Sequence, residues 1–206
     1  MAFVRRLPFT LFMELAIIVV ALTHNVVLGD LRLAVELRWG FGPQNLRDGR
    51  LYTLVTAPFF VRNLRMFLGI LLFVGYSVGI YEWVAGTRRA LLLYWSTNIG
   101  VWTLAAALIA VWLSSTTTPQ GHNLMLLTDV GPSVGGMGCV GGWVNQLPRR
   151  YRPWAFFGLL AYLAAKLALN PEPFADTAHL IVFPVGFALD HLLWHRPDCI
   201  AKREAR

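Results

Sequence analysis

Six long apolar runs dominate the sequence and decide what the chain can fold into. They cover residues 8–28, 64–84, 90–113, 133–147, 153–169 and 177–194. A helix crosses a bilayer with about twenty mostly apolar residues, and with fewer where neighbouring helices cover it. Hydrophobic residues form 56% of the chain and charged residues only 14%, whereas about a quarter of a typical soluble domain is charged. The sequence therefore predicts one all-α membrane domain over residues 1–206, with six transmembrane helices and no separate soluble domain.

The basic residues gather in short clusters at alternate ends of these runs. The clusters are Arg5 and Arg6; Arg88 and Arg89; Arg149, Arg150 and Arg152; and, in the basic C-terminal tail 196–206, Arg196, Lys202, Arg203 and Arg206. Cytoplasmic loops of membrane proteins carry an excess of Lys and Arg, so we expect both termini in the cytoplasm. The net charge of +7 then reflects topology and not nucleic-acid binding, which needs a basic face beside stacking aromatic residues.

The outer segment, residues 29–63, connects the first two runs. Apolar and charged residues alternate over 31–39 as they would in a strand, but an open strand edge is not tolerated in lipid. We therefore expect a short interfacial helix or a loop there. Gly42, Pro43 and Asn45 are expected to break regular structure directly after it.

Several polar residues interrupt the apolar runs. They are Glu14, His24, Asn25, Asn98 and Lys166. Such groups either line a polar cavity, as in a transporter, or pair with one another. Because the sequence has no broken helices and no repeated half, we favour structural pairing. The histidines and acidic residues share no ligand spacing, so we expect no metal site and no cofactor.

Ser133 and His179 lie at the starts of the fourth and sixth runs. Both runs enter from the outer face in the predicted topology, so the two side chains should lie at similar depth. If the two helices touch, the imidazole can accept the hydroxyl proton and activate the serine as a nucleophile. Asp176, three residues before His179, is expected to cap the sixth helix. A serine in a glycine-rich helix is more often a packing residue, and a lone membrane histidine is often structural, so spacing alone leaves both roles open.

Glycines recur along the fourth run at steps of four, three and four. They are Gly131, Gly135, Gly138 and Gly142. This spacing places them on one helix face, where small residues let a second helix come close. On the sixth run, Gly186 shares a face with His179. The pattern predicts close packing of these two helices, with Gly135, Gly138, Gly142 and Gly186 as packing residues.

Residues 131–141, with the sequence GPSVGGMGCVG, resemble the serine motif of the rhomboid intramembrane proteases. That motif is Gly-x-Ser-Gly with two further glycines downstream, and the matching residues are Gly131, Ser133, Gly138 and Gly141. His179 followed by Gly186 is similar to the histidine helix of the same family.

Three further segments carry the same resemblance. Residues 49–52 and 56–59 resemble the start of the rhomboid outer loop, and Glu82 and Gly86 resemble the residues that close its second helix. The resemblance runs in order from about residue 50 to residue 193. It implies that Ser133 is the nucleophile and His179 the general base of a dyad that cuts transmembrane segments near their outer ends.

Three positions depart from the family pattern. They affect how the site would stabilise the oxyanion, the negative oxygen that forms when the serine attacks a peptide carbonyl. The resemblance implies that backbone N–H groups around Ser133, between Gly131 and Val134, help to hold it. The His and Asn that rhomboid proteases add as donors correspond here to Met66 and Ile70, which cannot donate a hydrogen bond. Val134 replaces the glycine after the serine and is expected to crowd the site. Asn63 lies one turn before Met66 and is the nearest substitute donor, although it should lie nearer the surface.

Two functions from different classes remain open. One is a divergent rhomboid-like intramembrane serine protease that uses the Ser133–His179 dyad. The other is a non-catalytic rhomboid-like protein that binds transmembrane helices or serves as a subunit of a larger membrane complex. In both cases we expect transmembrane helices of other proteins and lipid as partners, no nucleic acid, and the bacterial cytoplasmic membrane as the location.

Overall fold

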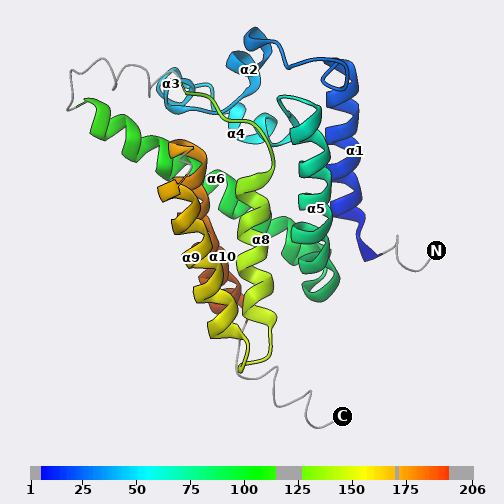
Figure 1. Cartoon of the computed structure of the whole chain (residues 1–206), viewed down its shortest axis with the longest axis vertical. Helices are drawn as coiled ribbons and strands as arrows, with labels where there is room; N and C mark the ends of the chain where they lie inside the picture. The colour runs from blue at the N-terminus through cyan, green and yellow to red at the C-terminus, as the bar shows by residue number, and fades with distance from the viewer. Residues whose placement is uncertain (1–5, 115–126, 170–171, 195–206) are drawn as a thin grey trace.

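The computed structural model describes residues 6–114, 127–169 and 172–194, which are helical apart from short connections and one isolated β-bridge (Figure 1). Six long helices coincide with the six apolar runs: α1 (Pro8–Thr23), α5 (Leu64–Ala85), α6 (Thr87–Ser114), α8 (Ser133–Gln146), α9 (Arg152–Leu169) and α10 (Pro173–Trp194). The predicted all-helical fold is confirmed for this part of the chain. Arg5, the stretch 115–126 and the basic tail 196–206 lie outside the described residues.

The surfaces of several helices are strongly apolar. Two helical segments, Leu64–Ala85 and Ala175–Trp194, are long and apolar enough to cross a membrane, and α1 is a shorter apolar helix. Leu15 on α1 is 62% exposed, and Leu72 on α5 and Leu192 on α10 are each 75% exposed. Soluble monomers rarely expose large contiguous apolar surfaces. The fold therefore indicates association with a membrane.

The outer segment folds into short helices that cover one end of the long ones (Figure 1). These are α2 (Leu33–Trp39), α3 (Pro43–Arg47), α4 (Thr53–Thr56) and the 3₁₀ turn η2 (Ala57–Phe59). The short helix expected within 31–39 is present as α2. The expectation that residues 42–45 break regular structure is wrong, because Pro43 takes a position in the first turn of α3. A helix does not need the missing proline N–H there.

Two helix ends differ from the apolar runs that predicted them. α1 ends at Thr23 because Asn25, with a left-handed φ of 57°, cannot continue a right-handed helix. His24 and Asn25 therefore lie beyond the helix. α10 begins at Pro173, so Asp176 lies in its first turn, where its Oδ2 accepts the backbone N–H of Glu172 at 2.8 Å. Asp176 thus satisfies a donor at the helix start from inside the helix, not from the expected cap position.

Glu82 on α5 completes the start of α1. Its carboxylate is fully buried and accepts the backbone N–H groups of Phe9 (3.0 Å) and Thr10 (2.8 Å) and the Thr10 hydroxyl (2.7 Å). These N–H groups belong to the first turn of α1, which has no side-chain cap of its own. A negative charge at the positive end of the helix dipole adds to the stabilisation. The contact fixes α1 against α5.

α8 lies at the centre of the bundle and packs against α5, α6, α9 and α10. A Cβ atom added to Gly135 would lie 2.6 Å from the Tyr94 ring, and one added to Gly138 would lie 2.2 Å from Thr97 Oγ1. Tyr94 and Thr97 belong to α6. Side chains at Gly135 and Gly138 would therefore point toward α6, whereas the backbone of Gly138 also contacts Gly186 of α10, as the predicted packing of these two helices requires. Gly131 lies outside α8, in a left-handed conformation with φ 116°.

The close approach of α8 to α10 uses Gly141 and Gly186. A Cβ atom at Gly186 would lie 2.2 Å from the carbonyl oxygen of Gly138, and one at Gly141 would lie 2.2 Å from that of Phe183. Both contacts are with backbone atoms, so no flexible side chain can move aside. Gly142 faces Tyr81 of α5 and Leu93 of α6. The two helices whose starts hold Ser133 and His179 are thus in backbone contact.

A buried carboxylate joins three helices at the end of the bundle away from the outer segment. Asp190 of α10 is fully buried and accepts hydrogen bonds from Tyr81 of α5 and from Asn145 (2.8 Å) and Gln146 (2.6 Å) of α8. Buried charges are tolerated when several donors satisfy them. The network holds the same helices together that meet at the glycine contacts.

Candidate active site

Ser133 and His179 meet where α8 and α10 approach the outer segment. Ser133 is the first residue of α8, and His179 lies in the second turn of α10. The Ser133 hydroxyl oxygen lies 2.9 Å from His179 Nε2, so the approach expected from depth and glycine packing is present. A neutral imidazole at this distance can accept the hydroxyl proton as the oxygen attacks an electrophile.

Backbone N–H groups surround the serine. The first helical hydrogen bond of α8 runs from Gly136 N–H to the carbonyl of Pro132, at 2.9 Å. The N–H groups of Ser133, Val134 and Gly135 precede that bond, so they have no acceptor within the helix. Donors at a helix N-terminus stabilise a negative oxygen held near them. The start of α8 can therefore supply donors to an oxyanion without a side chain.

A cavity of about 730 Å³ gives access to the pair. Ser133 and His179 both line it. Its apolar wall includes Met66 and Ile70, and its charged rim includes Arg62, Arg65, Asp129 and Glu172. The cavity is large enough for several side chains of a bound peptide, and it connects Ser133 and His179 to the residues around Arg62 and Asn63.

Met66 and Ile70 both lie close to the segment that leads into Ser133. A Cβ atom at Gly131 would lie 2.9 Å from Met66 Cε and 3.9 Å from Ile70 Cδ1, so both side chains face the segment just before the serine. Asn63 is exposed and caps α5, with its Oδ1 accepting Met66 N–H at 2.9 Å. Its side-chain NH₂ group stays on the cavity rim as a potential donor.

Val134 does not crowd the site. Its side chain is fully buried in a core cluster that includes Phe41, Trp102 and Met137, and it does not line the cavity. The expectation of crowding is therefore wrong. The first turn of α8 directs Ser133 toward α10 and the next residue toward α6 and the outer segment, since consecutive helix residues point about 100° apart.

The segment that leads into Ser133 is fastened to the outer segment by its backbone. Phe41 and Asp129 form an isolated bridge with N–H to O distances of 2.9 and 2.7 Å. Gly131 N–H donates to the carbonyl of Ala57 at 2.9 Å. A side chain at Gly42 would collide with Leu127, which lies 2.1 Å from its added Cβ atom. The position of Ser133 therefore depends on the outer segment as well as on α8.

A charge cluster reinforces this attachment. Arg62 donates to Glu36 at 3.0 Å and to the Thr128 carbonyl at 2.8 Å, and it lies 3.5 Å from Asp129. Burial raises the pKa of Asp129 to about 6, against the opposing effects of Arg62 and of the Val130 N–H. The sequence pattern did not predict this cluster, because Arg62, Glu36 and Asp129 lie far apart in the chain and share no local spacing. An acidic residue just before the serine motif was the available signal.

Two of the five polar residues that interrupt the apolar runs, Lys166 and Asn98, have polar partners. Lys166 of α9 bonds to Asp176 and lies 3.3 Å from Glu172, both near the start of α10. Asn98 donates to the Leu54 carbonyl at 3.0 Å. These contacts hold α9 to α10 and α6 to α4, as structural pairing predicts. Lys166 and Asn98 therefore do not line the cavity at Ser133.

Comparisons with known proteins do not assign a function to this site. Comparisons of the chain with protein-family models, with curated proteins and with solved structures returned no match.

Proposed function

We propose that the chain is a rhomboid-like intramembrane serine protease that cuts transmembrane segments of other proteins. The observation that carries the proposal is the 2.9 Å contact between Ser133 Oγ and His179 Nε2 beside an accessible cavity. The N–H groups of Ser133, Val134 and Gly135 support it, because they have no acceptor within the helix and belong to the residue that would attack and the two that follow it. The buried position of Val134 supports it as well, since it leaves the cavity free.

The reaction follows from these groups. His179 Nε2 takes the hydroxyl proton as Ser133 Oγ bonds to the carbonyl carbon of the scissile peptide, and the carbonyl oxygen becomes an oxyanion facing the α8 N–H groups. The carbon–nitrogen bond then breaks as His179 passes the proton to the leaving amine. Water then attacks the resulting ester and loses a proton to His179, which passes that proton to Ser133 Oγ as the ester bond breaks, so that a carboxylic acid and the free serine hydroxyl are released.

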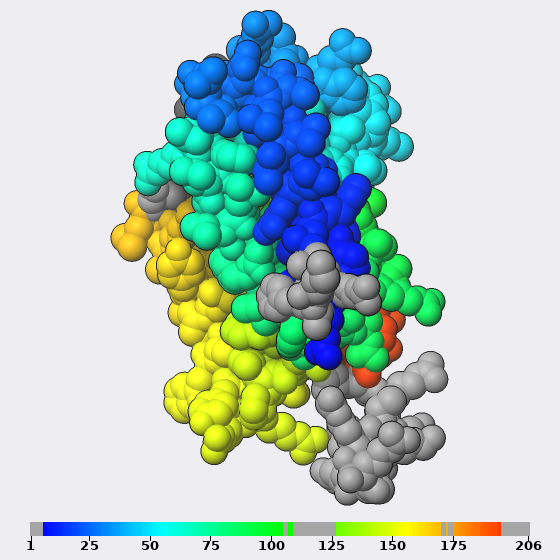
Figure 2. Space-filling model, turned by 90° about the vertical axis from the view of Figure 1, so that its right-hand side faces the viewer, coloured from blue at the N-terminus to red at the C-terminus, as the bar shows by residue number. Residues whose placement is uncertain are grey.

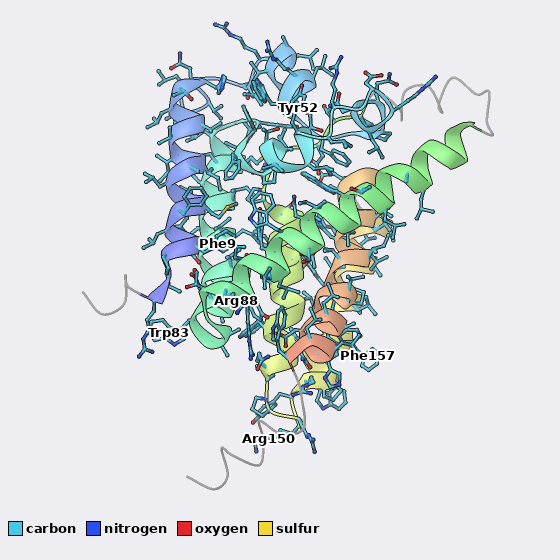
Figure 3. The ribbon with its side chains drawn as sticks, turned by 180° about the vertical axis from the view of Figure 1, so that it is seen from behind. Phe9, Tyr52, Trp83, Arg88, Arg150 and Phe157 are labelled. Carbon is cyan, nitrogen blue, oxygen red and sulfur yellow. The ribbon has the colours of Figure 1, made fainter. Side chains whose placement is uncertain are left out.

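The proposed topology has six crossings, formed by the six long helices, in the bacterial cytoplasmic membrane. α8 has 14 residues, about 21 Å at 1.5 Å per residue, which is short for a bilayer. Neighbouring helices cover it, so it does not need to match the lipid by itself. Figure 3 labels Tyr52 at the outer-segment end and Trp83 and Arg150 toward the opposite end, which suits a cytoplasmic side rich in arginine.

Reporter fusions test this topology. Fusions after Arg89, after Arg150 and at Arg206 are expected to report the cytoplasm, because the basic clusters stay inside. Fusions at residues 117 and 173 are expected to report the outer side. An outer signal from Arg206 would contradict the six crossings and separate Ser133 from His179 in depth.

A fluorophosphonate probe tests the reactive pair in detergent-purified protein. Ser133 Oγ is expected to displace fluoride and become labelled, and Ser133→Ala and His179→Ala should each reduce labelling at least about a hundredfold, since the two residues act as a unit. Ser96→Ala is the matched control, because Ser96 is an exposed serine on α6 and should not affect labelling. Folded protein that stays unlabelled at Ser133 with excess probe would contradict the protease proposal.

The second candidate is a non-catalytic protein that binds transmembrane helices. Met66 and Ile70 favour it, because they give the cavity an apolar wall where an oxyanion would need donors. In that case Ser133→Ala leaves cellular function intact, and the helix that occupies the cavity can be captured by cross-linking without cleavage.

A further inference from the structure

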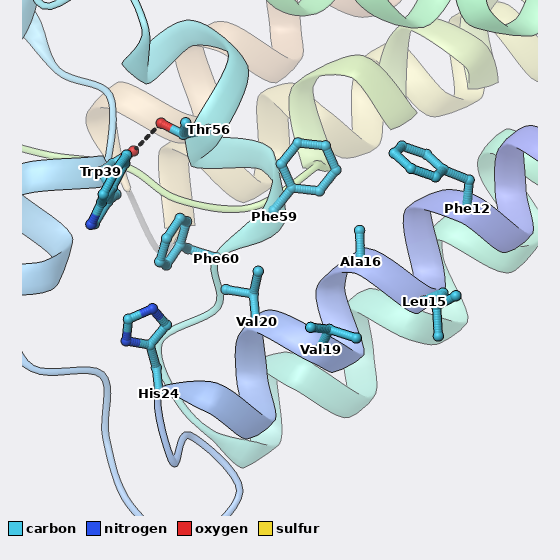
Figure 4. Close-up of a pocket in the computed structure, with 10 residues that line it drawn as sticks. All are labelled: Phe12, Leu15, Ala16, Val19, Val20, His24, Trp39, Thr56, Phe59 and Phe60. Carbon is cyan, nitrogen blue, oxygen red and sulfur yellow. Dashed lines mark hydrogen bonds between the residues drawn. The ribbon is translucent and has the colours of Figure 1, made fainter.

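A second cavity lies on the far side of α5 from the reactive pair, between α1 and the outer segment. It has a volume of about 670 Å³ (Figure 4). Leu15 and Val19 line it from α1, and Trp39, Phe59 and Phe60 line it from the outer segment. Figure 2 looks onto the α1 side of the molecule, with α1 running down beside the short helices. This groove shares no residue with the cavity at Ser133.

The groove continues into a polar pocket at its outer end. His24 lines both the groove and a second pocket of about 480 Å³, to which Asn25, Asp30 and Arg32 also contribute. The Arg32 guanidinium and the Asp30 carboxylate are on exposed residues and make no hydrogen bond or ion pair within the described part of the chain. One cation and one anion without a partner in the described residues thus line the pocket that adjoins the apolar groove at His24.

The groove follows α1 over most of its length. Phe12 and His24 mark its two ends along the chain, about 18 Å apart at 1.5 Å per residue. α1 ends at Thr23, so in the proposed topology His24 lies at one edge of a hydrocarbon core of roughly 30 Å. The polar pocket therefore lies at the depth of the lipid headgroups when the apolar part of the groove lies among the acyl chains.

We infer that this composite site binds a zwitterionic phospholipid of the outer leaflet. An acyl chain occupies the groove, the phosphate lies between Arg32 and His24, and the ammonium group of the headgroup lies beside Asp30. Charge complementarity selects this occupant: a transmembrane helix would leave Arg32 and Asp30 without partners, and a purely anionic lipid would leave Asp30 opposed to its charge. The inference rests on the proposed membrane location but not on proteolysis.

The test uses the full chain purified in mild detergent and incubated with phosphatidylethanolamine or phosphatidylglycerol, and native mass spectrometry counts the lipid retained. The unchanged protein is expected to retain one phosphatidylethanolamine per chain. Arg32→Ala should weaken retention of both lipids about tenfold, because both carry a phosphate. Asp30→Asn should abolish the preference for phosphatidylethanolamine, so that this variant retains the two lipids equally. Both changes are on exposed residues, so the fold is not at risk.

Ala16→Trp fills the groove and is expected to reduce retention at least tenfold. Leu72→Trp is its matched control, because Leu72 is 75% exposed on α5 and lies outside the groove. Equal retention in these two variants would mean that lipid coats the protein without a site, and it would overturn the inference. Displacement of the lipid by a transmembrane peptide or a second copy of the chain would overturn it too. Fluorophosphonate labelling of the same samples separates this result from the fate of the protease proposal.

Discussion

Gly186→Ala is expected to lower the free energy of unfolding by about 3 kcal/mol or more, at the upper end of what overpacking does to a core. The added methyl group would lie 2.2 Å from the Gly138 carbonyl oxygen, and a backbone atom cannot turn away as a side chain can. The two helices must therefore separate. Unfolding of the purified protein by increasing sodium dodecyl sulfate measures the change.

Gly158→Ala provides the matched control. Gly158 lies in the interior of α9, and nothing lies within 4 Å of an added Cβ atom. The same substitution there should stabilise the helix by up to about 1 kcal/mol, since alanine is the better helix former. If the two variants have the same free energy of unfolding, the backbone contact between α8 and α10 does not limit stability. Ser133 labelling should fall with Gly186→Ala, because the dyad depends on that contact.

The double change Met66→His with Ile70→Asn is expected to raise cleavage of a transmembrane peptide substrate about a hundredfold, the typical effect of one oxyanion donor. Both side chains line the cavity at Ser133, one helical turn apart on α5. Donors at these positions can reach a developing negative oxygen that the α8 N–H groups otherwise hold alone. Cleavage rates at saturating substrate measure the effect, because the donors act in the transition state.

The matched control is Leu68→His with Leu72→Asn. These residues have the same spacing on α5, but both are exposed on its outer surface and lie outside the cavity. They should give no increase. Were the double change at Met66 and Ile70 equally without effect, and Ser133→Ala harmless in cells, the protein would be the non-catalytic helix binder.

The apolar runs were sufficient to predict the six long helices but not where they end. The first run stays apolar through Val26, Val27 and Leu28, so hydropathy continues the helix past the point where Asn25 turns the backbone. Partition of a segment into lipid depends on the summed hydropathy of its side chains. The end of a helix depends instead on the backbone conformation of single residues, which hydropathy does not describe. The short α3 was missed for the opposite reason, since a proline that stops a helix interior suits its first turn.

The contact between Ser133 and His179 could be anticipated because two helix starts at one membrane depth need only touch. The packing of the residues around this contact could not be predicted from the sequence. Residue spacing identified the glycine face of α8 without revealing that α6 covers it, and the identity of Val134 did not reveal that its side chain points into the core. The link from Arg62 to Asp129 joins segments 67 residues apart in sequence, and no local pattern records it.

The start of α1 obtains its hydrogen-bond acceptor, the Glu82 carboxylate, only after α5 has been synthesised. Glu82 follows Phe9, whose N–H group it accepts, by 73 residues. At about 5–20 residues per second, a ribosome needs roughly 4 to 15 seconds to add that stretch. During this interval the inner end of α1 has donors that water or lipid headgroups must satisfy, and α1 is only 16 residues long. In the proposed topology, the first crossing is therefore complete only after the second has been translated.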